Sequence, residues 1–117
     1  KTDCYLMQTS YMLKVTGNDY ARVFALCATT GDEYHITCYQ SLGRDASGQN
    51  ASTAAITKTR CMLGTDQEQQ SNCIIGAVKD FISYFHSFDQ GKAFCHSLDM
   101  DLSEICLAIG EQYYKNL

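Results

Sequence analysis

Seven cysteines and three histidines are the residues of this chain best suited to bind a metal or form covalent links. Cysteine thiolates bind zinc or act as redox groups in close pairs, but the sequence has no Cys-x-x-Cys pair and no Cys-x-x-Cys-His motif. His35 lies three residues before Cys38 and His96 directly follows Cys95, and neither spacing matches a zinc site. The remaining chemistry is disulfide formation in an oxidising compartment. We therefore expect disulfides, no bound metal and no cofactor.

The spacing of the cysteines alternates between long and short. Successive gaps are 23, 11, 23, 12, 22 and 11 residues, which gives a period of 33 to 35 residues. This period is the length of one helical-hairpin repeat. We therefore interpret residues 1–117 as a single domain made of units 4–37, 38–72 and 73–105, followed by a terminal capping helix over 106–117.

Each unit has the pattern of two helices separated by a break. In three units a glycine follows the first cysteine by three to five residues, at Gly43, Gly76 and Gly110. Gly17 and Gly48 mark breaks before a second helix, Asn18 is placed to cap one such helix, and Thr65 with Glu68 fits a capping box. Proline is absent and alternating β-branched runs are short. The sequence predicts an all-α fold, a short α-solenoid of about three and a half antiparallel helix pairs.

Such an array brings the ends of consecutive hairpins together, so the cysteines would lie along one edge. Two pairings are then open. Pairs within the hairpins would be Cys4–Cys27, Cys38–Cys61 and Cys73–Cys95, leaving Cys106 over. Pairs across the short gaps would be Cys27–Cys38, Cys61–Cys73 and Cys95–Cys106, leaving Cys4 over. We favour the second set because it fastens each hairpin to its neighbour, where a solenoid is weakest. Cys4 would then be unpaired or form an intermolecular disulfide.

Two segments carry a resemblance to a known family. CYQSLG (38–43) and FDQGKAFC (88–95) resemble the secreted bacterial cysteine-rich helical repeats of the tetratricopeptide-like superfamily, in which one cysteine ends a helix and another begins the next. The resemblance implies a TPR-like array that binds protein on a concave helical face. It transfers no catalytic residue.

Aromatic residues gather in the segment DFISYFHSF (80–88). Four of them recur at helical offsets of three, four and seven: Phe81, Tyr84, Phe85 and Phe88. This spacing is typical of a buried core stripe. It also suits a groove into which a partner helix or an apolar ligand docks, and these four residues are the candidate groove.

Charge and motif content argue against several function classes. The net charge is −4 and the nine basic residues are scattered singly, so we expect no nucleic-acid partner. No apolar run is long enough to span a bilayer, and no GxSxG, HExxH or phosphate-binding loop occurs. Asn50-Ala51-Ser52 is a sequon that could be glycosylated at Asn50.

These observations favour a secreted, extracellular or periplasmic protein without enzymatic activity. We expect it to bind protein or act as a scaffold, either alone or as a subunit of a larger assembly. The alternative is a small helical carrier that holds an apolar ligand in the aromatic groove.

Overall fold

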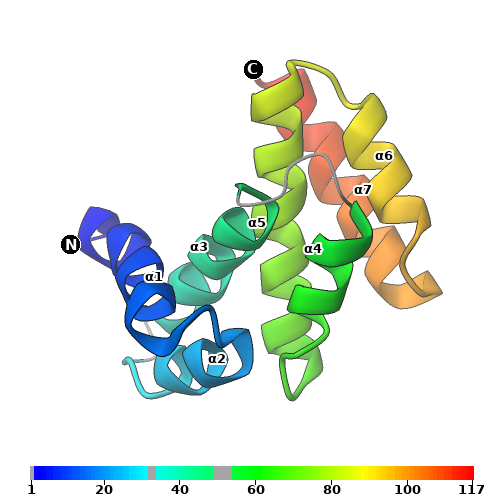
Figure 1. Cartoon of the computed structure of the whole chain (residues 1–117). Helices are drawn as coiled ribbons and strands as arrows, with labels where there is room; N and C mark the ends of the chain where they lie inside the picture. The colour runs from blue at the N-terminus through cyan, green and yellow to red at the C-terminus, as the bar shows by residue number, and fades with distance from the viewer. Residues whose placement is uncertain (1, 32–33, 49–53) are drawn as a thin grey trace.

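The computed structural model describes residues 2–31, 34–48 and 54–117, with side chains from Thr9 onward. Within these ranges the chain is all-helical and contains no β-strand (Figure 1). The helices are α1 (Thr2–Thr16), α2 (Tyr20–Ala28), α3 (His35–Gly48), α4 (Ala54–Cys61), α5 (Gln67–Phe85), α6 (Asp89–His96) and α7 (Met100–Lys115). The predicted all-α array of antiparallel helix pairs is therefore confirmed.

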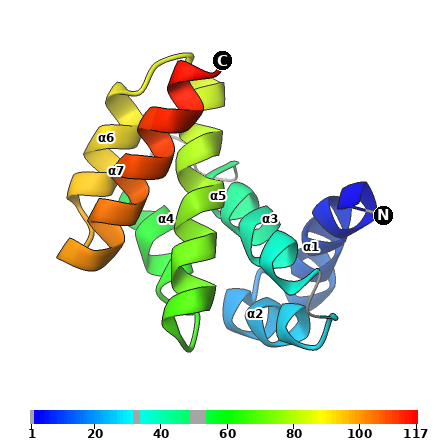
Figure 2. The ribbon, with the colours of Figure 1, turned by 180° about the vertical axis from the view of Figure 1, so that it is seen from behind.

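The odd-numbered helices pack side by side in chain order. α3 packs between α1 and α5, and α5 packs between α3 and α7. Figure 2 shows α7, α5, α3 and α1 following one another across one side of the molecule, with α4 behind α5. We call the surface formed by these four helices the odd-helix face. The shorter helices α2, α4 and α6 form the second row, so the core lies between the two rows.

Aspartates at the ends of the links begin three of the helices. Asp66 caps α5 by accepting a hydrogen bond from the Gln69 backbone N–H at 2.8 Å, and Asp19 and Asp99 cap α2 and α7 in the same way. The predicted caps at Asn18 and Thr65 are each wrong by one residue. Asn18 instead has a φ of 64°, because it turns the chain between α1 and α2. Gln69 Oε1 accepts a hydrogen bond from the Thr65 backbone N–H at 2.9 Å, so the side chain at the third helical position returns to the residue before the cap.

The odd-numbered helices begin before their cysteines. α3, α5 and α7 start three, six and six residues ahead of Cys38, Cys73 and Cys106. The helix that the sequence places over 106–117 is α7, which spans Met100–Lys115. Its earlier start follows from the Asp99 cap, which lets the preceding link join the helix. Each of these cysteines therefore lies inside its helix and points into the core.

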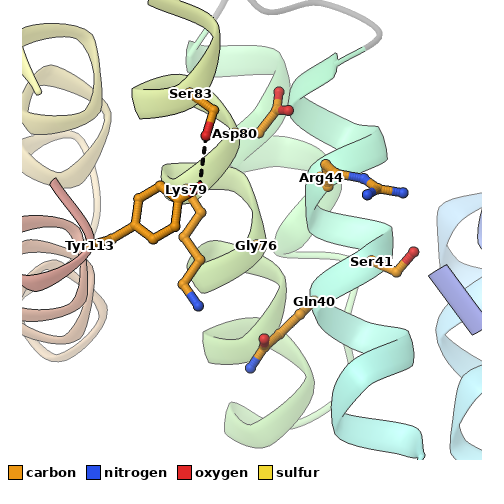
Figure 3. Close-up of a pocket in the computed structure, with 8 residues that line it drawn as sticks. All are labelled: Gln40, Ser41, Arg44, Gly76, Lys79, Asp80, Ser83 and Tyr113. Carbon is orange, nitrogen blue, oxygen red and sulfur yellow. Dashed lines mark hydrogen bonds between the residues drawn. The ribbon is translucent and has the colours of Figure 1, made fainter. Parts of the chain in front are cut away.

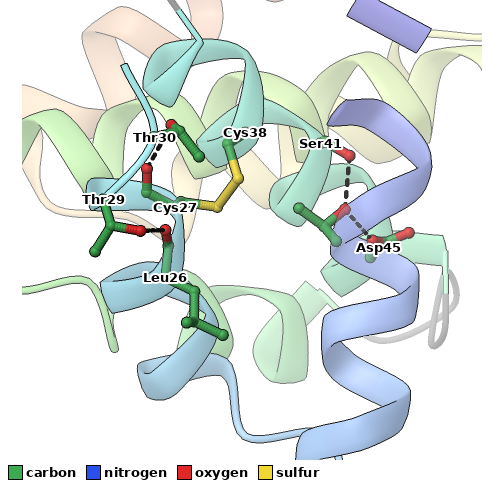
Figure 4. Close-up of a disulfide and its surroundings, with 8 residues drawn as sticks. Leu26, Cys27, Thr29, Thr30, Cys38, Ser41 and Asp45 are labelled. Carbon is green, nitrogen blue, oxygen red and sulfur yellow. Dashed lines mark hydrogen bonds between the residues drawn. A yellow bond between two sulfur atoms is a disulfide. The ribbon is translucent and has the colours of Figure 1, made fainter. Parts of the chain in front are cut away.

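Three disulfides fasten each even helix to the next odd helix. Cys27–Cys38 joins α2 to α3 (Figure 4), and the other two join α4 to α5 and α6 to α7: Cys61–Cys73 and Cys95–Cys106. All six half-cystines are fully buried. These are the pairs across the short gaps that the sequence favours. Cys4 lies in α1, but its side chain is outside the described residues, and so is Asn50. An unpaired or intermolecular Cys4 and glycosylation of Asn50 therefore stay predictions.

Two glycines allow α3 and α5 to cross with their backbones in contact. A Cβ atom on Gly76 would overlap the backbone carbonyl of Gln40, and one on Gly43 would overlap the carbonyl of Cys73. In α7, a Cβ on Gly110 would lie 2.6 Å from the ring of Phe88, the residue that precedes α6. The glycines that recur after the cysteines are therefore required by close helix packing. This packing also fixes the position of α5 within the odd-helix face.

Candidate functional site

The four aromatic residues predicted to line a groove are divided between core and surface. Phe81 and Phe88 are 2% and 7% exposed, Phe85 is half-buried and Tyr84 is 65% exposed. The rings of Phe81 and Phe94 lie 5.2 Å apart in the core. α5 ends at Phe85, so Phe88 does not continue the helical stripe. These four side chains therefore do not line one groove, and the core interpretation describes the two buried rings.

The histidines are spread over the surface rather than gathered. His35 Nε2 lies 3.3 Å from Glu68 Oε1, which links α3 to α5. His86 ends α5 in a left-handed conformation and His96 is the last residue of α6, both exposed. In the part of the chain that the structure describes, no three His, Cys, Asp or Glu side chains form a group that could hold a metal ion.

The strongest candidate site is a cavity on the odd-helix face, which we call the central cavity. It has a volume of about 360 Å³ and lies where α3, α5 and α7 meet (Figure 3). Most of the residues that line it carry a polar or charged group: Gln40, Ser41, Arg44, Gly76, Lys79, Asp80, Ser83 and Tyr113. A second cavity of about 290 Å³, the side cavity, shares Lys79 and Tyr113. It adds Ile109 and Gln112 from α7 and Asn116, which caps the end of that helix. Together the two form a groove across three consecutive odd helices.

The groove residues occupy equivalent positions along their helices. In α5 they are 76, 79, 80 and 83, and in α7 with its C-cap they are 109, 112, 113 and 116. Both sets have offsets of three, four and seven, which place side chains on one helix face. The sixth residues after Cys38, Cys73 and Cys106 are, in that order, Arg44, Lys79 and Gln112. The seventh residues are Asp45, Asp80 and Tyr113. Residues at the same distances after Cys73 and Cys106 therefore line the groove.

The same two positions interact between neighbouring odd helices, by direct contact in the first and last pairs and electrostatically in the middle pair. Ser10 Oγ donates a hydrogen bond to Asp45 at 3.0 Å between α1 and α3. In the next pair, the Arg44 guanidinium is close enough to Asp80 to lower the pKa of that carboxyl. In the last pair, the Lys79 ammonium lies 5.6 Å from the centroid of the Tyr113 ring. The sixth residue of one helix thus contacts the seventh of the next in the first and last pairs, and Arg44 and Lys79 are the two cations of the groove.

Between α1 and α3 the equivalent position is closed by hydroxyl groups. The Thr9 hydroxyl donates to Asp45 Oδ2 at 2.7 Å and lies 2.6 Å from Ser41 Oγ (Figure 4). Thr9 and Ser41 are 0% and 1% exposed. Hydroxyls so deeply buried are out of reach of a substrate, and the bonds of this group are hydroxyl–hydroxyl and hydroxyl–carboxylate hydrogen bonds. The group is therefore a polar link between the first two odd helices.

Asp80 is the acidic group of the central cavity. Burial raises the pKa of its carboxyl above the ordinary value, and the nearby Ser47 hydroxyl and Arg44 guanidinium lower it in part. Ser47 is fully buried, and among the described residues its hydroxyl makes no hydrogen bond of ordinary length and angle. The ionised form of Asp80 is therefore disfavoured in the folded protein.

Asp80→Asn is expected to stabilise the protein at neutral pH and to change it little in acid. The pKa of Asp80 is raised in the folded state, so the folded protein binds this proton more tightly than the unfolded chain does. The free energy of unfolding therefore falls as pH rises above about 3.9, the ordinary pKa of aspartate. Urea unfolding of both proteins across this window measures the difference. Asp101→Asn, at an exposed position of α7, is the control. A stability difference that stays constant with pH would contradict this account.

Tyr113 forms one wall of the groove and joins α7 to α5. Its hydroxyl lies 2.8 Å from Ser83 Oγ, while the Lys79 side chain extends across its ring (Figure 3). Lys79 is half-buried, and no acidic group in the described residues forms an ion pair with it. An ammonium held this way retains its attraction for an incoming anion.

None of the helices within the described ranges is long and apolar enough to cross a membrane. Comparison of the chain with protein-family models, with curated proteins and with solved structures found no match.

Proposed function

We propose that this protein is an extracytoplasmic, non-catalytic module that binds another protein on its odd-helix face, either as a scaffold or as a subunit of a larger assembly. The observation that carries the proposal is the groove formed by the central and side cavities, which crosses α3, α5 and α7. Its lining of amides, hydroxyls, an aromatic ring and cations resembles the polar composition of transient protein interfaces.

The disulfides support a secreted or periplasmic location. Three disulfides in a chain of 117 residues persist in oxidising compartments and are rare in the cytosol. Their complete burial favours a structural role over redox catalysis, which needs an accessible sulfur atom.

A carrier of apolar ligands is less well supported. A cavity of about 630 Å³ next to α4 is lined by Met62 and Leu63 but also by Lys58. A cavity of about 690 Å³ between α6 and α7 includes Phe88 and Tyr114. Its lining also includes Lys92, Glu111 and Lys115, and an apolar ligand would have to displace water from these charged groups. Among the described residues, none of these four cavities is lined by apolar side chains alone.

Site-specific photo-crosslinking in the producing cells tests this proposal. A photoreactive amino acid replaces Gln112, which is exposed on α7 beside the groove, and the control replaces Ala25, which is exposed on α2 in the second row. We expect a protein adduct of defined mass from position 112 and none from position 25. Adducts of equal yield at both positions, or none at 112, would contradict the proposal. A small molecule retained in native mass spectra and removed by delipidation would favour the carrier.

A further inference from the structure

We propose that the groove on the odd-helix face recognises an extended acidic peptide, whose carboxylates pair with Lys79 and Arg44. This inference rests on the proposed protein-binding function and names the chemistry of the partner. Neighbouring helices are about 8–10 Å apart, so a chain crossing from α3 to α7 covers about 16–20 Å. About five or six residues in extended conformation span that distance.

Charge is the first reason for an acidic partner. The protein has a net charge of −4, yet the central cavity holds two cations and one carboxylate. That carboxylate belongs to Asp80, and the two cations leave the cavity with a net positive charge even when Asp80 is ionised. The groove is thus a locally positive site on an acidic protein, and such a site attracts anionic segments while the remaining surface repels them.

The placement of the two cations is the second reason. Arg44 extends from α3 on the side facing α1, whereas Lys79 extends between α5 and α7 toward Tyr113 (Figure 3). The cations therefore stand at separate points along the groove and suit a segment with acidic side chains at separate positions. The half-buried Lys79 is the stronger contact, because its surroundings screen its charge less than those of the exposed Arg44.

The polar lining between the cations suits a peptide backbone. Gln40 and Gln112 supply side-chain amides at opposite sides of the groove, and an amide can both donate to and accept from a peptide group. Gln40 is already oriented, because its Nε2 donates to Asn72 Oδ1 at 2.8 Å and its own oxygen is turned away from that bond. Ile109 and the Tyr113 ring add apolar contact area in the side cavity.

Selection from random displayed peptides tests the inference. Peptides of about twelve residues, twice the expected span, are selected on the oxidised full-length protein, then synthesised with a fluorophore and titrated by anisotropy. We expect the enriched sequences to contain Asp or Glu, and we expect their binding to weaken as NaCl increases.

Matched variants locate the contact. Lys79→Gln is expected to weaken binding about tenfold, and Arg44→Gln to weaken it less. Lys79→Arg should retain binding, and Asp80→Asn should strengthen it. Lys92→Gln is the control, because Lys92 also lies over an aromatic ring, 5.4 Å from the centroid of Phe88, but outside the groove. Circular dichroism verifies that each variant is folded.

Several results would overturn the inference. These are enriched peptides without acidic residues, no enrichment at all, or equal binding by Lys79→Gln and the unchanged protein. Lys79-dependent binding of oligogalacturonate without any peptide binding would assign the groove to an acidic saccharide. Salt-sensitive self-association lost in Lys79→Gln would make a second copy the occupant. If position 112 still crosslinks to a protein while the peptides fail, the proposed function stands and only the acidic specificity falls.

Discussion

Gly76→Ala is expected to destabilise the protein by at least about 3 kcal/mol, because the new methyl group has no space at the crossing of α3 and α5. The atom it would meet is the Gln40 backbone carbonyl, which cannot move aside as a flexible side chain can. The two helices would have to separate, and the core beneath them would lose contacts. Thermal unfolding should show a midpoint lower by more than about 10 °C. Gly43→Ala should behave alike, because its Cβ would meet the Cys73 carbonyl.

Gly48→Ala is the matched control for this prediction. Gly48 is the last residue of α3, and among the described residues a Cβ there would approach Asp80 Oδ2, at an ordinary contact distance of 3.8 Å. Alanine also favours helix over glycine by up to about 1 kcal/mol, so this variant should be neutral or slightly more stable. Equal stability of Gly76→Ala and Gly48→Ala would show that α3 and α5 do not cross in backbone contact.

Reduction of the three disulfides is expected to unfold the protein near physiological temperature. Each disulfide closes a loop of 11 or 12 residues, and such a loop contributes about 3 kcal/mol in the chain-entropy view. The three together equal about 9 kcal/mol, comparable to the whole stability of a small domain. Circular dichroism with and without dithiothreitol, under conditions where reduction is complete, should show loss of helix.

Single disulfides can be removed to resolve their contributions. The double variant Cys61→Ala/Cys73→Ala should unfold at a free energy lower by about 3 kcal/mol, because it releases the middle hairpin from α5. Cys4→Ala is the control, since it removes a cysteine outside the three disulfides. A reduced protein that keeps its helices and its unfolding midpoint would contradict the view that the disulfides hold the array together.

Much of the fold can be predicted from the sequence because the cysteine period repeats a single structural unit. The spacing predicts an all-α array and favours the pairing across the short gaps, which is the pairing in the structure. Local capping is less well defined by the sequence. Asn18 and Asp19 are both good caps, and the left-handed turn at Gly17-Asn18 selects Asp19. Likewise, the glycines at 43 and 76 are visible as a pattern, but only the helix crossing explains them.

The candidate site is harder to predict, because its residues are unremarkable one at a time. Arg44 and Lys79 are isolated cations in an acidic sequence, and Tyr113 is one of eight tyrosines. Their common position after the cysteines is the signal that would have found them, since each is the sixth or seventh residue of its unit. The aromatic spacing in residues 80–88 is the more conspicuous pattern and predicts a groove at a different place. Its pattern breaks where α5 ends at Phe85, so Phe88 packs beside Tyr114 of α7.

The location of the disulfides is relevant to the proposed function. All six half-cystines are buried, whereas Lys79, Gln112 and Tyr113 remain at least partly accessible on the odd-helix face. The hairpins can therefore be fastened together without closing the groove. A preformed groove of this kind binds with little loss of conformational entropy, which favours recognition of a flexible peptide.

A non-reducing peptide map tests the disulfide-linked array of hairpins most directly. The protein is isolated from its producing cells with its free thiols blocked. The account predicts peptides linked by Cys27–Cys38, Cys61–Cys73 and Cys95–Cys106. Links within the hairpins, such as Cys38–Cys61, would contradict the helix arrangement on which the groove depends. Six blocked thiols at these positions would contradict both the array and the extracytoplasmic location.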